Sequence, residues 1–149
     1  MNESIIAVLT GLLDSMGASY ERVTEGSIAG QPLLRIETSD PSALIGTRGE
    51  TLLALDHLLK RLVEQRDIRT ERFILDVNEY QASRIREIEM RAKMMAERAR
   101  SFAYDVELPP MRPYERLIVH STLADEPHVK TESQGEGKER RVVIRYVAE

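Results

Sequence analysis

The sequence predicts an α+β protein made of two small modules that follow one another along the chain. Patterns typical of amphipathic helices alternate with shorter patterns typical of strands, and they fall into two groups. The apolar fraction, 42% over 149 residues, is sufficient for a hydrophobic core. The strongest helical pattern, over residues 80–104, opens the second group. We therefore expect a first module over residues 1–79 and a second over residues 80–149.

The first module is expected to have the element order α-β-β-α-α-β. Apolar residues recur every three or four positions from Ile5 onward, and Gly17 ends that helix. A second, short helix is expected with Asp40 as its N-cap and Pro41 in its first turn, ending at Gly46. The remaining expected elements are strands over 18–25 and 31–38 joined by a turn over 26–31, a helix from the end of the following loop to about residue 66, and a strand over 71–79.

The second module is expected to have the order α-β-α-β-β. Its first helix carries an apolar stripe with helical spacing, formed by Ile85, Ile88, Ala92, Met95, Ala99 and Phe102. The double proline at 109–110 excludes a central strand there, and Pro113 opens a short helix that runs to about Leu123. The last part of the chain predicts a hairpin of strands over 129–134 and 140–147 around a glycine-bearing tip.

Composition limits the classes of function. The absence of cysteine excludes disulfides, thiolate zinc sites and cysteine nucleophiles. The net charge of -4 favours only modest non-specific nucleic-acid affinity, but residues 80–104 hold six cations against three acids, and a phosphate responds to such a local patch. No segment approaches the ~20 apolar residues that span a membrane, and the acidic N-terminal stretch differs from an export leader. We therefore expect a cytoplasmic protein with no membrane partner.

The stretch "LIGTRGE" at residues 44–50 is the first candidate site. Gly46 and Gly49 permit a tight turn and the close approach of another chain, because neither has a Cβ atom. The loop precedes a helix N-terminus, which favours an anion, and Arg48 adds a positive charge. These features suit a sugar-phosphate backbone. The alternative is a helix-turn-helix connection in which glycine only tolerates the bend.

The arrangement of elements and the residues "ALIGTRGETLLALDHLLKRLVEQR" resemble a KH domain. In that family a GxxG loop holds the backbone of about four unpaired nucleotides. The resemblance implies that Gly46 and Gly49 allow close approach, that Thr47 and Arg48 contact phosphate, and that an apolar floor for bases is formed by Leu44, Ile45 and Leu53. For Leu53 we favour burial in the core, because apolar residues at helical spacing are usually buried.

The second candidate site lies in "MRPYERLIVHSTL", where Arg116 and His120 stand four residues apart and so share one helix face. A cation beside an imidazole can hold a phosphate, and Arg112 extends the same face by one turn. The alternative is that His120 packs locally and Arg116 pairs with a nearby acid. In the hairpin, Arg140 and Arg141 point to opposite faces if both lie on a strand, so at most one joins the phosphate path.

This Arg-x-x-x-His helix, preceded by a long basic helix and followed by "VKTESQGEGKERRVVI", is similar to the R-three-H domain, a binder of single-stranded nucleic acid. A KH module followed by such a domain resembles the bacterial Jag (SpoIIIJ-associated) family of RNA-binding proteins, closely over residues 30–147. Many Jag proteins carry a further N-terminal domain, whereas this chain begins almost directly at the KH helix. The resemblance implies that nucleic acid is bound by Gly46, Thr47, Arg48, Gly49, Arg112, Arg116, His120 and Arg140.

The cations of residues 80–104 form two rows with a seven-residue repeat. Arg84, Arg91 and Arg98 flank the apolar stripe, while Arg86, Lys93 and Arg100 lie on roughly the opposite side of the helix. We favour a ligand-facing or interdomain role for the first row and a solvated surface for the second.

No pattern predicts an enzyme, a metal site or a cofactor. No Gly-x-Ser-x-Gly, Walker-type or His-x-x-x-His motif occurs, and the polar loop that includes His128 is explained without a metal. The leading hypothesis is a protein that binds single-stranded RNA and acts as a post-transcriptional regulator or RNA chaperone. The alternatives are a protein-interaction module, as a homodimer or with a KH-protein partner, and a binder of single-stranded DNA.

Overall fold

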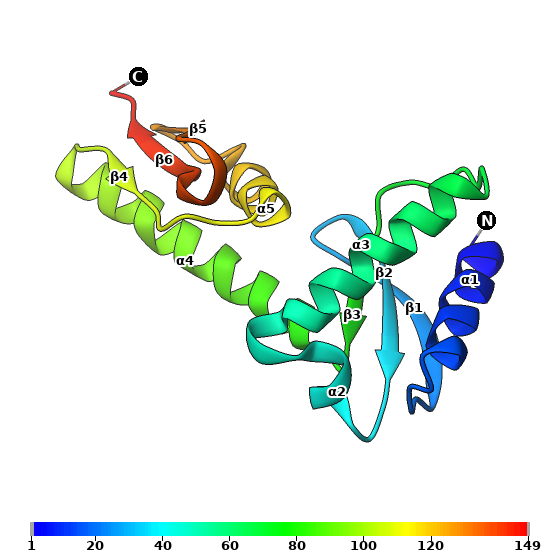
Figure 1. Cartoon of the computed structure of the whole chain (residues 1–149). Helices are drawn as coiled ribbons and strands as arrows, with labels where there is room; N and C mark the ends of the chain where they lie inside the picture. Colours follow the sequence, from blue (N-terminus) through cyan, green and yellow to red (C-terminus); the bar gives the residue numbers. More distant parts are fainter. Residues whose placement is uncertain (1, 149) are drawn as a thin grey trace. The chain divides into compact units, whose positions relative to one another are not determined.

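The computed structural model describes residues 2–148 and confirms the α+β class, with two small three-stranded sheets and helices packed on them (Figure 1). The chain divides into two compact units, Met1–Ala82 and Ser83–Glu149. Both predicted element orders are found, with a short 3-10 turn added in each unit. Among the described helices, none is long and apolar enough to cross a membrane.

The first unit is a three-stranded sheet with helices on one face (Figure 1). Its elements are α1 (Asn2–Ser15), β1 (Arg22–Ile28), β2 (Gln31–Glu37), α2 (Pro41–Ile45), the 3-10 turn η1 (Thr47–Gly49), α3 (Glu50–Gln65) and β3 (Ile74–Val77). The strand order is β1-β2-β3, with β1 antiparallel and β3 parallel to β2. Alternate residues of β2 and β3, among them Ile36 and Leu75, are buried with Leu9, Leu52 and Leu59 from α1 and α3. This shared core fixes the position of α3.

The second unit is an antiparallel sheet with strand order β4-β6-β5. Its elements are α4 (Tyr80–Phe102), whose first three residues belong to the first unit, β4 (Val106–Glu107), α5 (Pro113–Leu123), β5 (Val129–Gln134), the 3-10 turn η2 (Gly137–Glu139) and β6 (Arg141–Tyr146). Ala92, Ala96 and Ala99 of α4 are buried against Val119 of α5 and Val142 of β6. Their small side chains allow close packing. As expected from the prolines, β4 is a short edge strand.

The start of α4 is held by Asp76 of β3, which is fully buried. Its Oδ1 accepts hydrogen bonds from the backbone N–H groups of Val77 and Gln81, both at 2.7 Å, and its Oδ2 accepts one from Ala82 at 3.3 Å. The Nε atom of Arg35 lies 3.6 Å from Oδ2. A carboxylate at a helix N-terminus satisfies donors that have no partner within the helix and interacts favourably with the helix dipole. Asp76 therefore determines where α4 begins.

The predicted turn over 26–31 and the start of the first strand were wrong. β1 runs from Arg22 to Ile28, so only Ala29 and Gly30 form the turn, with φ angles of 51° and 75°. Positive φ at both central residues is the type I′ pattern that matches the twist of a hairpin. Phe102 was also misplaced in the apolar stripe. It is 71% exposed at the end of α4 and contacts the Tyr104 ring edge-on.

Candidate nucleic-acid interface

The loop between α2 and α3 presents Thr47 and Arg48 to solvent. As predicted, α2 begins at Pro41 and ends before Gly46, whose φ is 73°. Arg48 and Gly49 also have positive φ angles, 55° and 78°. The loop therefore projects two exposed side chains immediately before the N-terminus of α3, where the helix dipole favours an anion.

Both glycines of the loop are required by the chain itself. A Cβ atom on Gly46 would clash with Oγ1 of Thr51, and one on Gly49 would lie 3.0 Å from the hydroxyl of Tyr80. Gly49 is buried. Neighbouring side chains fill the space that a Cβ atom would need at both positions, and φ is positive at both. Local packing and backbone conformation therefore explain why positions 46 and 49 are glycine. Space for an approaching nucleic acid remains a prediction for the exposed residues Thr47 and Arg48.

The three residues predicted to form an apolar floor have different environments. Leu44 is 2% exposed and belongs to the core, and Ile45 is half-buried. Leu53 is 41% exposed, so the preference for burying it in the core was wrong. It lies on α3 one residue after Leu52, which is fully buried, and helical rotation turns Leu53 away from that core face. Ile45 and Leu53 are thus the two apolar residues of the three that a ligand can reach.

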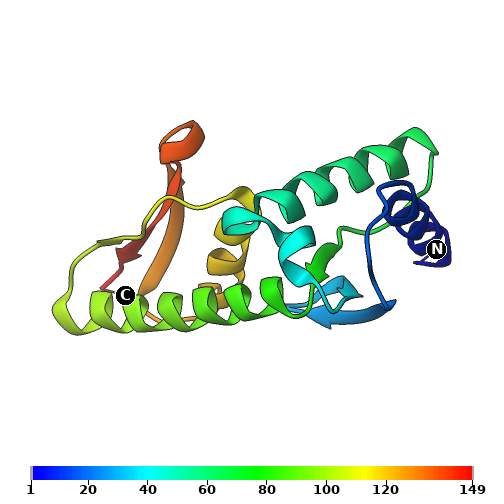
Figure 2. The same cartoon turned by 60° about the horizontal axis from the view of Figure 1, so that its bottom comes forward.

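In the second unit, a groove of about 560 Å³ brings together four cations: Arg112, Arg116, Lys138 and Arg140. We call it the basic groove. Arg112 and Arg116 come from the start of α5, and Lys138 and Arg140 come from the β5–β6 tip, which lies at the end of the hairpin away from α4 (Figure 2). The helix period predicted the first two residues as neighbours. Lys138 was missed, and its position in the glycine-bearing tip was the available signal.

Hydrogen bonds fix the α5 side of the basic groove. The guanidinium of Arg116 donates to the carbonyl of Met111 at 2.6 Å. Glu115 is buried; its Oε1 accepts from the backbone N–H of Arg112 at 3.1 Å, and its Oε2 accepts from the guanidinium of Arg84 at 3.0 Å. Among residues 2–148, Glu115 is the one acid that lines the basic groove, and it is already engaged by α5 and α4. Because its charge is paired, the field at the groove remains positive.

His120 does not line the basic groove but connects the two elements that form it. Its Nδ1 lies 2.6 Å from Oγ1 of Thr131 and its Nε2 lies 3.0 Å from Oγ of Ser133, both on β5. Burial and the nearby charge of Arg116 lower the pKa of His120 below its ordinary value. A neutral imidazole has one donor and one acceptor nitrogen, so both are used by the two hydroxyls. A hydrogen bond from His120 to a phosphate stays a prediction.

Arg140, just before β6, and Arg141, the first residue of β6, have different partners. The Arg140 guanidinium lines the basic groove and donates to the carbonyl of Gly135 at 2.7 Å. The Arg141 guanidinium bonds to Glu107 of β4 at 3.0 Å. The two side chains therefore have separate surroundings, and the participation of at most one of them in a phosphate path stays a prediction.

The two cation rows of α4 are only partly as expected. Arg84 and Arg91 line a hollow in the second unit, next to the segment that joins β4 to α5. In the row assigned to solvent, Arg100 was misplaced. Its side chain is 22% exposed and pairs with Glu97 at 2.7 Å and with Glu126 at 3.1 Å. Within residues 2–148, no group of three potential metal ligands is found.

The match to a known protein family lies within the second unit. Residues 86–146 match the family model of the R-three-H domain, and this range includes Arg112, Arg116, His120, Lys138 and Arg140. The chain is 30% identical to the RNA-binding protein KhpB of Clostridium symbiosum over 145 residues, 97% of this chain and 65% of that protein. It is 31% identical to the RNA-binding protein KhpB of Bacillus subtilis over 105 residues, 69% of this chain and 50% of the relative.

A third relative, the RNA-binding protein KhpB of Lactiplantibacillus plantarum, is 31% identical over 111 residues, 74% of this chain and 34% of that protein. The chain thus spans between about a third and two thirds of the length of these relatives. The basic groove lies in the part of the chain that matches the R-three-H domain, and most of the chain is similar to relatives named as RNA-binding proteins.

Proposed function

We propose that this chain binds single-stranded RNA, without enzymatic activity, and acts as a post-transcriptional regulator or RNA chaperone. The observation that carries the proposal is the convergence of Arg112, Arg116, Lys138 and Arg140 on one groove within the R-three-H match. Lysine and arginine bind phosphate oxygens, and such contacts provide most of the affinity of nucleic-acid binders. The names of the relatives support RNA as the ligand.

In the basic groove, the phosphates of an unpaired strand lie along the guanidinium and ammonium groups. Arg116 is oriented by the carbonyl of Met111, and Arg140 by the carbonyl of Gly135. His120 acts here as a positioning residue, because its two hydroxyl partners join α5 to the hairpin whose tip carries Lys138. If each of the four cations neutralises one phosphate, log K falls with log salt at a slope of about -2.8, that is -0.7 for each contact.

The first unit supplies a second binding surface with the character of a KH domain. Its element order, its sheet order β1-β2-β3 and the exposed loop before α3 support this assignment. Thr47 and Arg48 contact phosphate there, and Ile45 and Leu53 provide accessible apolar surface for bases. Two weak surfaces on one chain raise the joint affinity, because binding at one increases the effective concentration of the strand at the other.

A titration tests the proposal. Fluorescence anisotropy compares a labelled single-stranded RNA, the DNA of the same sequence and an RNA duplex across a salt series. Arg116→Gln and Lys138→Gln are each expected to weaken single-strand binding and to flatten the salt slope by about 0.7. Lys93→Gln is the matched control, because Lys93 is an exposed cation of the same unit that lies outside the basic groove.

The outcomes separate the candidate functions. Equal losses of RNA affinity in the groove variants and in the control would show that only net charge matters and would refute binding of RNA in the basic groove. Tighter binding of DNA than of RNA would favour the single-stranded DNA alternative.

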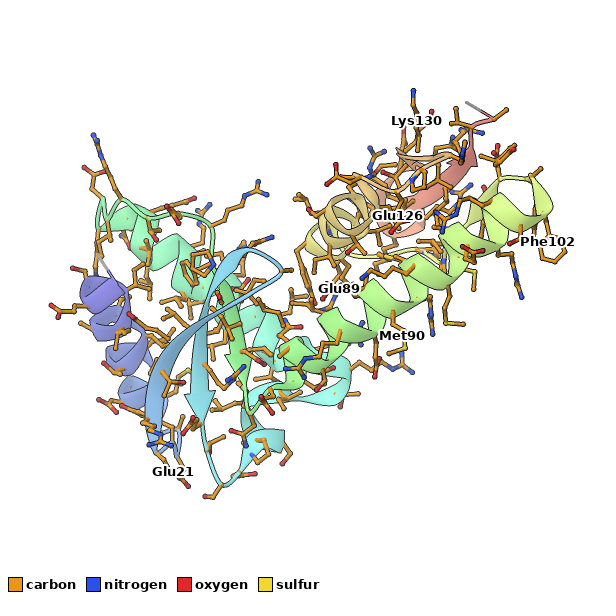
Figure 3. The ribbon with its side chains drawn as sticks, turned by 180° about the vertical axis from the view of Figure 1, so that it is seen from behind. Glu21, Glu89, Met90, Phe102, Glu126 and Lys130 are labelled. Carbon is orange, nitrogen blue, oxygen red and sulfur yellow. The ribbon has the colours of Figure 1, made fainter. Side chains whose placement is uncertain are left out.

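The protein-interaction alternative rests on Met90 and Met94, which are 64% and 61% exposed one turn apart on α4; Met90 lies on the side of α4 away from α5 (Figure 3). A dimer in sedimentation without RNA binding would favour it.

A further inference from the structure

A second hollow, of about 240 Å³, adjoins the basic groove within the second unit. We call it the α4 hollow. The two share Pro110, Met111 and Glu115 as lining residues, so the segment before α5 separates them. A strand held by its phosphates in the basic groove therefore has the α4 hollow within reach of an adjacent base. The volume equals that of about eight water molecules in the liquid, which is comparable with a single planar heterocycle.

One part of the wall of the α4 hollow is apolar and rigid. Ile88 of α4 is half-buried and Leu108 is 3% exposed. Pro109 and Pro110 are exposed to solvent, and their rings cannot rotate away because φ is fixed. This apolar part suits a flat, weakly hydrated group, and the charged residues of the hollow lie beside it.

The rim of the α4 hollow carries one cation and one carboxylate that are both accessible. Glu87 and Arg91 lie one turn apart on α4, and both are exposed. Within residues 2–148, no ion pair of 4 Å or less joins them. The other two charged lining residues, Arg84 and Glu115, are bonded to each other at 3.0 Å. Glu87 and Arg91 are therefore exposed charged groups of the rim that a ligand can engage without breaking the Arg84–Glu115 ion pair.

We propose that the α4 hollow binds one unpaired nucleobase that carries an exocyclic amino group, next to the phosphates held in the basic groove. This inference rests on the proposed RNA-binding function and gives it a base preference. The Arg91 guanidinium stacks on the base, as arginine planes do in recognition of single-stranded RNA. The Glu87 carboxylate accepts a hydrogen bond from the amino group, because an ionised carboxylate is an acceptor only.

The same geometry disfavours uracil. Cytosine and uracil share the pyrimidine ring and differ at positions 3 and 4. At position 4, which faces Glu87 in this proposal, cytosine has an amino donor and uracil has a carbonyl acceptor; at position 3, cytosine has an acceptor nitrogen and uracil an N–H donor. A uracil carbonyl beside the Glu87 carboxylate leaves two acceptors facing each other. A contact of this type discriminates between bases by at least about five-fold. The expected preference is therefore for cytosine over uracil at the base that enters the α4 hollow.

The test uses the full chain and two single-stranded RNA probes of equal length, oligo(C) and oligo(U), by anisotropy at neutral pH. Wild-type protein is expected to bind oligo(C) at least about five-fold more tightly. Glu87→Gln is expected to bring the ratio close to one, mainly by tightening oligo(U), because the glutamine amide both donates and accepts. Glu89, which is labelled on α4 in Figure 3, is not among the residues that line the α4 hollow. Glu89→Gln removes the same charge from the same helix and is expected to keep the wild-type ratio.

A wild-type ratio near one, or a ratio that survives Glu87→Gln, would overturn the base pocket. The proposed function would still stand in that case, provided that binding of oligo(U) depends on Arg116 and weakens with salt. Loss of the ratio in Glu89→Gln as well would assign the preference to net charge and also overturn the pocket. If neither probe binds the wild-type protein, the proposed function falls, and the pocket falls with it.

Discussion

Replacing Arg48 by glycine is expected to stabilise the first unit while weakening its binding of RNA. Arg48 is held at φ 55° and ψ 25°, in the left-handed region. A residue with a Cβ atom is destabilised there by ~1–2 kcal/mol. Glycine adopts this conformation without that steric cost, although its greater freedom in the unfolded chain opposes folding by ~0.5–1 kcal/mol. The difference predicts a free energy of unfolding that is higher by ~0.5–1 kcal/mol in Arg48→Gly.

The effect on binding has the opposite direction. Arg48 is exposed before the N-terminus of α3, and removing its guanidinium removes one proposed phosphate contact. The salt slope for single-stranded RNA is expected to flatten by about 0.7. Arg48→Ala is a second variant with the same loss of charge, but it keeps a Cβ atom in the left-handed region and is expected to lack the gain in stability.

Urea unfolding followed by circular dichroism measures the first effect, and anisotropy across a salt series measures the second. Arg66→Gln is a suitable control, since Arg66 follows α3 at its other end, about 24 Å from the loop at 1.5 Å per residue. An Arg48→Gly variant less stable than wild type would refute the conformational reasoning. Wild-type affinity and slope in both Arg48 variants would refute the role of the loop in binding.

Three further predictions concern stability. Asp76→Ala is expected to destabilise the fold by ~3–5 kcal/mol in urea unfolding, because two backbone donors at the start of α4 and that of Val77 lose a buried carboxylate. A loss below ~1 kcal/mol would contradict this. Gly46→Ala is expected to cost ~1–3 kcal/mol through its positive φ and its contact with Thr51, whereas Gly11→Ala, in the open middle of α1, is expected to stabilise by ~0.5–1 kcal/mol. The pKa of His120 is lowered in the folded protein, so as pH decreases the imidazole is protonated in the unfolded chain before it is protonated in the folded one. The free energy of unfolding is therefore expected to fall as pH decreases below about 6.5 and towards the folded pKa. His120→Gln should remove this part of the pH dependence.

Local signals predicted the elements well where one residue type determines a boundary. Pro41 and Pro113 open α2 and α5, and Gly46 ends α2, as expected from their backbone restrictions. In the same way, the helical period predicted that Arg112 and Arg116 lie next to each other. Such features depend on a few consecutive residues, and the sequence contains them directly.

Features that depend on tertiary packing were not predictable from these patterns. The basic groove requires Lys138 to lie near α5, which depends on the pairing of β5 with β6. The partners of His120 lie 11 and 13 residues further along the chain. Leu53 and Phe102 have helical spacing, but periodicity does not show which flank of a helix another element covers.

The two hydroxyls that hold His120 also favour one pairing of the hairpin over its alternatives. Thr131 is paired with Ile144 and Ser133 with Val142, so both hydroxyls lie on the same face of β5. A slip of one residue would turn both away and bring Glu132 to that face in their place. A neutral imidazole then faces a carboxylate with no hydroxyl partner, and the buried Val142 and Ile144 of β6 face other neighbours. The hydrogen bonds of His120 therefore favour the correct strand register, in addition to the burial of hydrophobic residues.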